Sequence, residues 1–388
     1  MKKNLLLAML AAGLLASCSS GLDEVTDSTS PTNPENTNGN DNEQMEIRLG
    51  NGGLVSAAVS RAAIAPADWI GTDVGIFGLN KLPNANWTDN SISNGATDNL
   101  HCILNGVKAK IVDNATAGAT PQGISFVDKT FYYPRVSDKA YSFYGYYPYV
   151  APDNEAMLIT TDQVACNYVI TGQEDIIWGR AVATPATGTD GKQYDGYNAA
   201  FFRKISPTPA SPNIAFSHLL TKLTFSLVKG ADYKTDNCGV TEIKLTSVPK
   251  KGALTIASAN VNSSEGTISW TGTTVTNGTV ALDPVPADAA NITDVPAFKN
   301  QVPLVMEGEV KRIDVENSAV MLPANMAKYQ LSITINGSPT TLTVNPKNGN
   351  FLPGFAYNIA LTINGPMEVV MTATLKDWET GEEITTEI

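Results

Sequence analysis

Apolar and polar residues alternate with a period of two in several separate stretches of the chain. The pattern recurs in KLTFSLVKG (222–230), YQLSITING (329–337) and YNIALTING (357–365). Such alternation places successive side chains on opposite faces of a β-strand. Asn336-Gly337 and Asn364-Gly365 close two of these stretches, and the Asn-Gly pair favours a tight hairpin turn. We find no long stretch that combines the helical period with helix caps, so the sequence predicts an all-β fold.

The length of the chain accommodates more than one such unit. It has 388 residues, of which 43% are hydrophobic, and a domain takes on the order of 150 residues. Residues 205–213 (ISPTPASPN) are rich in Pro and Ser, which is typical of a linker. We therefore expect two tandem β-sandwich domains, over residues 46–208 and 209–388.

The first residues predict export. Lys2 and Lys3 precede an apolar run that is too short to span a membrane. The run ends in Leu15-Ala16-Ser17-Cys18, a lipobox, so we expect a lipoprotein signal peptide over 1–17 and a lipid on Cys18. An ordinary signal peptide with an incidental cysteine is the alternative. Residues 18–45 are polar and poor in apolar side chains, which predicts a flexible tether.

Charge and composition exclude several classes of function. The net charge of −12 argues against binding to nucleic acid, which requires a basic face. The sequence has only 2 histidines, His101 and His218, and carries no nucleophile elbow, phosphate loop or calcium loop. We expect no catalytic residues, no metal and no cofactor, and we expect His218 to hydrogen-bond to nearby backbone.

Three cysteines remain besides Cys18. Cys102, Cys166 and Cys238 are far apart in the sequence and form no CxxC pair. One disulfide is possible, but we favour three buried thiols that pack as small hydrophobic residues.

Aromatic residues are concentrated in residues 131–150 (FYYPRVSDKAYSFYGYYPYV). One interpretation is a platform on which sugar rings stack. The other is a set of core strands, and we favour it because Tyr141, Phe143, Tyr147 and Tyr149 share one face of a strand.

A lone arginine follows the first predicted strand. Residues 45–49 (MEIRL) alternate as a short strand does, and residues 55–69 (VSAAVSRAAIAPADW) are mostly small. Arg61 is the only basic residue of this segment, so an exposed linker would present it to a protease. An ordinary surface arginine is the alternative interpretation, and Arg48, inside the strand, is the rival cleavage site.

Six segments in the same order resemble one protein family along nearly the whole chain. They are WIGTDVGIFGL (69–79), YSFYGYYPYV (141–150), EDIIWGR (174–180), IAFSHLLTKLTFSL (214–227), FLPGFAYNIALTI (351–363) and LKDWETG (375–381). Together they resemble the fimbrillins, the FimA-like and Mfa-like pilus subunits of Bacteroides-type bacteria.

The resemblance implies a fold and a life cycle. It implies two sandwiches of transthyretin-like topology, a lipidated precursor at the outer membrane and an extracellular fimbrium. An Arg-specific surface protease would cleave at Arg61 and remove residues 46–61, and strands near the C-terminus of another subunit would fill the groove. The expected partners are other copies or related pilins, the protease and a host or bacterial receptor.

The C-terminal segment has the pattern that a donor strand needs. Residues 367–388 follow Asn364-Gly365 and Pro366, which predict a hinge. Alternate residues form one apolar face, namely Met367, Val369, Met371, Ala373 and Leu375.

A second function remains open from the sequence. A monomeric, uncleaved surface lipoprotein could bind glycans through the aromatic residues of 131–150. The pilus subunit is the favoured interpretation.

Overall fold

The structure is a computed structural model. All the residues that it describes belong to one compact unit, Asn33–Ile388. The described residues are 45–55, 69–80, 86–88, 101–112, 123–127, 129–134, 139–205, 207, 210–259, 264–270, 292–347, 349–365 and 368–376. The predicted signal peptide, Cys18 and Arg61 lie outside them.

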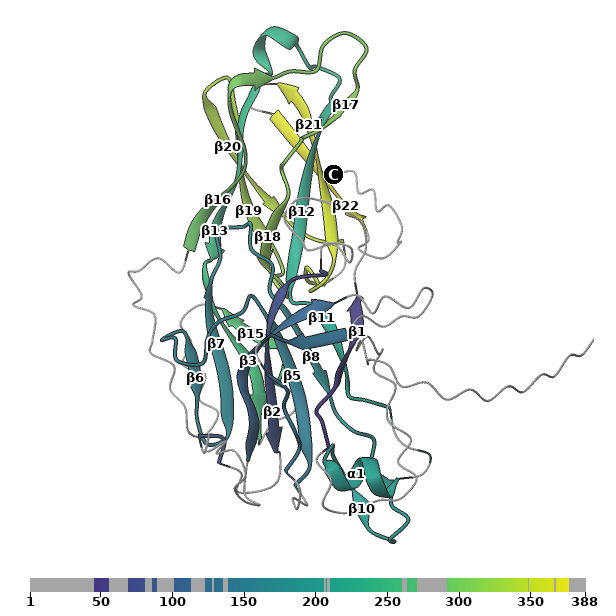
Figure 1. Cartoon of the computed structure of the whole chain (residues 1–388). Helices are drawn as coiled ribbons and strands as arrows, with labels where there is room; N and C mark the ends of the chain where they lie inside the picture. The colour runs from purple at the N-terminus through teal and green to yellow at the C-terminus, as the bar shows by residue number, and fades with distance from the viewer. Residues whose placement is uncertain are drawn as a thin grey trace, which may run out of the picture. The chain divides into compact units, whose positions relative to one another are not determined.

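Seven of the described strands close into a barrel (Figure 1). Burial alternates along one of them, in which Ile214, Phe216 and His218 are buried and the residues between them are exposed, whereas residues 74–80 and 141–146 of two others are buried throughout. In order around the barrel the strands are β1 (Leu49–Val55), β11 (Asn213–His218), β8 (Ile177–Ala181), β5 (Tyr141–Tyr147), β2 (Asp73–Asn80), β3 (Cys102–Val112) and β4 (Gly123–Phe126).

A four-stranded sheet covers one side of the barrel. Phe77 and Tyr144 of the barrel share a core with Cys166 and Leu254 of this sheet. A glycine in β5 permits close packing on the other side, because a Cβ at Gly145 would lie 2.5 Å from the ring of Phe216. The strands of the sheet are, in order, β15 (Thr267–Trp270), β14 (Lys251–Ser258), β7 (Gln163–Val169) and β6 (Met157–Ile159).

Two further sheets face each other around a separate core, which includes Phe225, Leu331 and Ile359. Among the described strands, the first sheet has the order β17 (Arg312–Asp314), β12 (Leu220–Lys229), β21 (Ala356–Gly365) and β22 (Glu368–Lys376), with β18 (Val320–Pro323) also paired to β12. The second has the order β16 (Ile292–Leu304), β13 (Val240–Pro249), β19 (Tyr329–Ile335) and β20 (Ser338–Val344).

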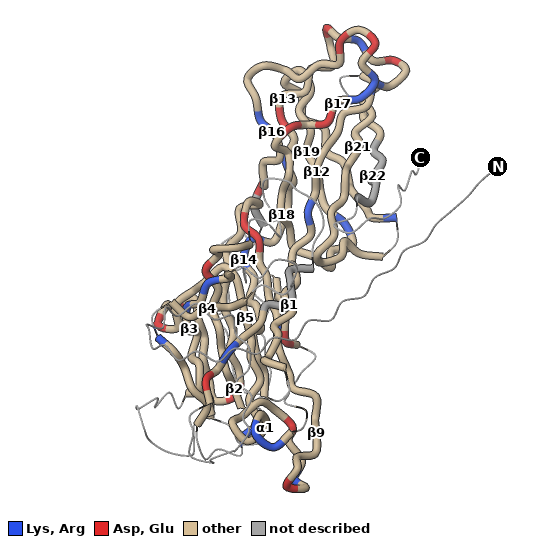
Figure 2. Tube along the Cα trace, turned by 45° about the vertical axis from the view of Figure 1, so that its right-hand side comes forward, with Lys and Arg blue, Asp and Glu red and all other residues tan. Residues whose placement is uncertain are grey.

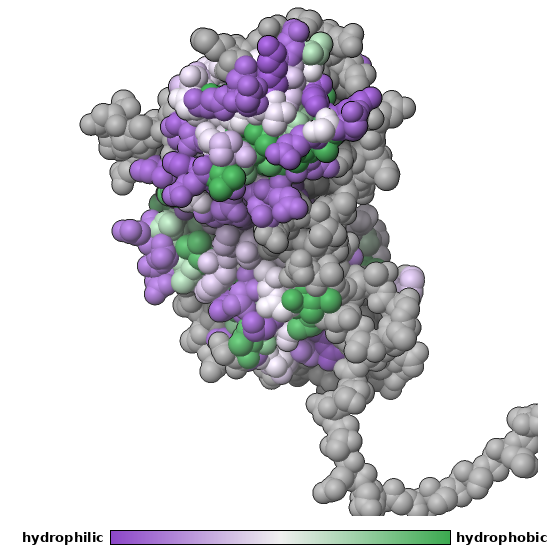
Figure 3. Space-filling view, turned by 90° about the horizontal axis from the view of Figure 1, so that it is seen from above, coloured by the Kyte–Doolittle hydropathy of each residue, from purple (hydrophilic) through white to green (hydrophobic). Residues whose placement is uncertain are grey.

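Little else is regular in the described part of the chain. The short elements are β9 (Ala186–Thr187), β10 (Gln193–Tyr194), the helix α1 (Ala199–Lys204) and a 3₁₀ turn at Thr235–Asn237. The all-β fold is as the sequence predicts. On the face drawn in Figure 3, hydrophilic side chains predominate and the hydrophobic ones form small separate patches.

The two Asn-Gly pairs behave differently. Asn336 and Gly337 have φ of 47° and 80° and join β19 to β20, as predicted. Asn364 and Gly365 instead belong to β21, and Gly365 is paired with Glu368. The expected turn at Asn364-Gly365 is therefore wrong, because both residues belong to the strand and Gly365 is still paired, after an irregularity of the ladder between Ile363 and Gly365.

The sheets combine segments from both sides of residue 208. β11 begins at Asn213 but pairs with β8 and β1 of the barrel. β14 pairs with β7 along most of its length, including Leu254 with Cys166. The boundary expected between residues 208 and 209 does not coincide with a division between sheets. The Pro- and Ser-rich composition of residues 205–213 predicts a linker but does not indicate which strands pair with one another. The three cysteines of the body are free and buried, as predicted.

Three buried ionisable side chains lie near the point where the barrel strand β11 leads into β12. His218 Nδ1 is 2.7 Å from Asp175 Oδ2, and both side chains are buried. The histidine thus contacts a carboxylate rather than only the backbone that the sequence suggested. Lys222 is 2% exposed, and its burial lowers the pKa of its ammonium to about 8, against the opposing effect of Asp175. Burial thus disfavours the charged lysine in the folded chain.

Lys222 should make the stability depend on alkaline pH. In the unfolded chain its pKa is near 10.5, so between pH 8 and 10.5 the unfolded state binds more protons and stability rises with pH. We expect Lys222→Met to lose this rise, measured as the free energy of unfolding in urea at pH 7.5, 8.5 and 9.5. The exposed Lys234→Met should keep it. An equal rise in both variants would contradict the assignment.

Candidate assembly sites at the two ends of the chain

The first strand closes the barrel. β1 runs parallel to β11, from Gly50 opposite Asn213 to Val55 opposite Ser217. On its other side it is antiparallel to β4, with Leu49 opposite Ile124. β1 therefore covers the backbone edges of two strands at once. Without it, both strands would have unpaired edges, which tend to recruit another strand.

The residues just before β1 are also bonded. The Ile47 amide donates to the Phe131 carbonyl, and the Tyr133 amide donates to the Met45 carbonyl, each at 2.8 Å. Ile47 and Leu49 are 2% and 6% exposed, so their side chains belong to the barrel core. Sequence patterning placed the strand at 45–49, but the strand itself begins at Leu49. Glycines in LGNGGLV hide the alternation from the sequence.

Of the two candidate cleavage sites, the structure describes only Arg48. Arg48 lies between Ile47 and Leu49, both of which take part in backbone pairing. Its guanidinium contacts the Glu46 carboxylate at 2.9 Å. A paired segment of this kind does not fit easily into a protease cleft. Arg61 lies outside the described residues.

The chain is anchored again directly after the linker. Trp69 is fully buried and its ring lies 5.3 Å from Phe216 and 5.8 Å from Tyr147, both edge-on. Residues 56–68 are thus flanked by two segments that are packed in the same core. Cleavage between these anchors would leave Trp69 and the strands after it in place.

The predicted donor segment is an edge strand. β22 is antiparallel to β21 from Glu368 opposite Gly365 to Lys376 opposite Ala356, and it ends the order of described strands in its sheet (Figure 1). Val369 packs against the core of this sandwich. Met371, Ala373 and Leu375 belong to β22 by their backbone, and Met367 lies outside the described residues.

Most of the aromatic residues of 131–150 belong to the core. Alternate residues of β5 point to two different cores, one containing Tyr141 and the other Tyr144. Tyr132 is 46% exposed, and Tyr147 and Tyr149 are only partly buried. Rings enclosed on both sides present no face on which a sugar could stack. The six buried ones are Phe131, Tyr133, Tyr141, Phe143, Tyr144 and Tyr146.

In the described part of the chain, no three His, Cys, Asp or Glu side chains are grouped so that they could hold a metal ion. No helix among the described residues has the length and apolar character needed to cross a membrane.

Comparison with known proteins identifies related chains. The sequence profile of a family described as fimbrillin-like matches residues 67–378. No curated protein matches. Similar solved structures include a cell adhesion protein from Bacteroides uniformis, at 15% identity over 86% of this chain and 98% of that chain, with a TM-score of 0.45. A fimbrial assembly protein from Parabacteroides distasonis has 10% identity, 89% and 99% coverage and a TM-score of 0.41. The fimbrial anchor protein Mfa2 from Porphyromonas gingivalis has 10% identity, 86% and 98% coverage and a TM-score of 0.34.

Substitutions at two neighbouring residues should show that the segment before β1 is packed. Ile47→Ala removes a buried side chain and should lower the free energy of unfolding by about 2–5 kcal/mol. Arg48→Ala removes only a partly exposed ion pair and should change it by less than about 1 kcal/mol. Urea denaturation of the uncleaved chain measures both. Equal effects would show that Ile47 does not belong to the core.

Proposed function

Because the chain belongs to the fimbrillin-like family, we propose that it is a structural subunit of a cell-surface pilus and assembles by donation of a strand. The precursor is exported as a lipoprotein, cleaved after Arg61 and relieved of the segment that includes β1. A strand from the C-terminal segment of another copy, or of a related pilin, then takes the vacant position. The resulting fimbrium supports adhesion.

The observation that carries the proposal is the position of β1. It is paired on both sides, to β4 and β11. Its covalent connection to the strands that follow is the linker 56–68. While the linker is intact, β1 is held at a high effective concentration beside its site. Cleavage turns its return into a bimolecular event, so a displaced β1 is lost by dilution.

The donor gains a second neighbour when it moves. At the edge of its own sheet, β22 is paired with β21 alone among the described strands. In the position of β1 it would pair with both β4 and β11. The four larger apolar side chains of the segment can each contribute roughly 1.5–3 kcal/mol on burial, about 6–12 kcal/mol in total before ordering costs. The net gain is the difference from the burial that β22 already has. The four are Met367, Val369, Met371 and Leu375.

The lipid on Cys18 would hold the precursor at the outer membrane until cleavage. We expect Cys18→Ala to abolish the incorporation of labelled palmitate, because the acyl chains are attached through this thiol. Mass spectrometry of the membrane fraction would locate the label. Persistent labelling of the variant would contradict lipidation at Cys18.

Cleavage and donation can be tested together by polymerisation. The chain treated with an Arg-specific protease should form fibres visible by electron microscopy. Deletion of 367–388 should prevent them, and so should Met371→Asp, which brings an unpaired charge into the groove. Thr372→Asp, on the opposite face of the strand, is the matched control and should still assemble.

The choice of cleavage site needs its own pair of variants. Arg61→Gln should block both cleavage and fibre formation, whereas Arg48→Gln should permit both. Fibres of normal length from the chain that lacks 367–388 would place the donor elsewhere and contradict the mechanism. A dependence on Arg48 would move the cleavage site into the strand.

A further inference from the structure

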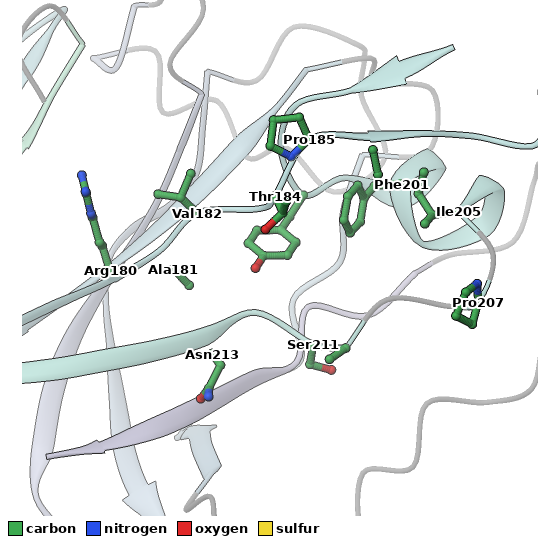
Figure 4. Close-up of a pocket in the computed structure, with 13 residues that line it drawn as sticks. Arg180, Ala181, Val182, Thr184, Pro185, Phe201, Ile205, Pro207, Ser211 and Asn213 are labelled. Atoms are coloured by element: carbon green, nitrogen blue, oxygen red, sulfur yellow. The ribbon is translucent and has the colours of Figure 1, made fainter. Parts of the chain in front are cut away.

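A cavity of about 500 Å³ lies on the barrel beside α1 (Figure 4). Its walls come from the end of β8, from α1 and from the segment that leads into β11. Apolar and polar residues share the lining: Val182, Pro185, Phe201 and Pro207 are apolar, and Thr184, Ser211 and Asn213 are polar. Val182 is 49% exposed, so the cavity is open to solvent.

The local sequence explains how α1 forms the aromatic wall of the cavity. Asn198 begins α1, and its side-chain oxygen accepts a hydrogen bond from the Phe201 amide at 2.7 Å. This N-cap fixes the helix and holds Phe201 edge-on to Tyr197, with ring centroids 5.5 Å apart. Both rings line the cavity. The aromatic part of the cavity is therefore pre-formed.

The cavity adjoins the end of the β1 site. Asn213 lines the cavity and is also the residue of β11 that pairs with Gly50. The Gly50 amide donates to the Pro212 carbonyl at 2.8 Å. A strand that ends at this point of the groove would extend its next residues towards the cavity.

The pairing of β1 with β11 is one that another strand could replace with a more stable pairing. It is parallel, and its register shifts between Asn51 and Leu54. Parallel pairing is slightly less stable per residue than antiparallel pairing, and glycines in a strand weaken it further. A donor strand that runs in the direction opposite to β1 would be antiparallel to β11. β1 pairs with β11 over more residues than it does with β4. The C-terminal end of the donor strand would then lie beside Asn213.

The segment that follows the donor strand has matching chemistry. Residues 377–388 (DWETGEEITTEI) contain one aromatic residue, Trp378, two positions after the end of β22. They also contain five acidic residues and no basic one. Arg180 lines the cavity, and its guanidinium contacts the buried Glu265 carboxylate at 2.9 Å. Arg203 and Lys204 occupy the last turn of α1, between the lining residues Phe201 and Ile205, and basic residues are blue in Figure 2.

We propose that this cavity binds residues 377–388 of a second copy, whose donor strand enters the groove in the direction opposite to β1. Trp378 fills the apolar part, and the acidic residues lie near the basic last turn of α1. The proposal rests on the strand donation proposed above and adds to it a direction and a second contact.

Binding of two peptides separates the two proposals. Peptides 367–376 and 367–388 are titrated by fluorescence anisotropy into the full chain cleaved after Arg61. The chain carries Met371→Asp, so that its own donor strand cannot compete. We expect both peptides to bind and the longer one to bind at least ten-fold more tightly, because it adds the contact of Trp378 in the cavity.

Matched variants test whether the tighter binding of the longer peptide comes from the cavity. Val182→Glu puts a negative charge at the cavity and should remove the advantage of the longer peptide, and Trp378→Ala in the peptide should do the same. Val169→Glu is the control, since Val169 is similarly exposed, at 53%, and belongs to β7. It should leave the advantage intact.

Disulfide trapping tests the direction. Ser211→Cys, at the wall of the cavity, should cross-link to the longer peptide with Asp377→Cys and not to one with Met367→Cys. The reverse pattern would mean that the donor runs in the direction of β1, and would overturn the proposal.

The remaining outcomes are also decisive. Equal affinities of the two peptides would overturn docking of the tail but leave strand donation standing. An advantage that survives Val182→Glu would place the tail on another surface and overturn the assignment to this cavity. If neither peptide binds, strand donation itself is wrong, and this inference is wrong with it.

Discussion

The barrel of this molecule depends on a strand that pairs with both β4 and β11. Backbone amides and carbonyls at a strand edge must be paired or solvated, and the side chains beneath them must be covered. β1 meets both needs, because it pairs on two sides while Ile47 and Leu49 enter the core. The barrel is complete only with a segment that the chain could exchange for one of another copy.

The two strands at the ends of the body are unequal in ways that suit such an exchange. β1 contains three glycines within seven residues and has an irregular register. β22 contains no glycine and keeps a regular ladder with β21 from Lys376 to Val369. In the proposed exchange, a glycine-rich strand would close the precursor and could still be replaced. Trp69, packed on Phe216, keeps the floor of the site in place on the other side of the linker.

The sequence predicted what depends on local patterning and missed what depends on distant pairing. The alternation in β12, β19 and β21 and the turn at Asn336-Gly337 were readable, because the period of a strand and the positive φ of a turn are local properties. The extent of β1 was not, since its glycines interrupt the pattern. The pairing of β14 with β7 and the contact of His218 with Asp175 join residues far apart, and no local signal records them. The apolar face of the donor segment was visible, but the edge position of β22 required the structure.

The short connection between β11 and β12 has a mechanical consequence. β11 ends at His218 and β12 begins at Leu220, and β12 then runs parallel to β21 over eight consecutive residue pairs. In a fibre joined by donated strands, tension would enter a subunit at β11, pass along β12 and leave through β21 to the next junction. Parallel strands under such a load are sheared along their length, so many hydrogen bonds resist together instead of being peeled apart one at a time. The route that would carry the pull therefore joins β11, which receives the donated strand, to β21, the neighbour of the donor strand β22.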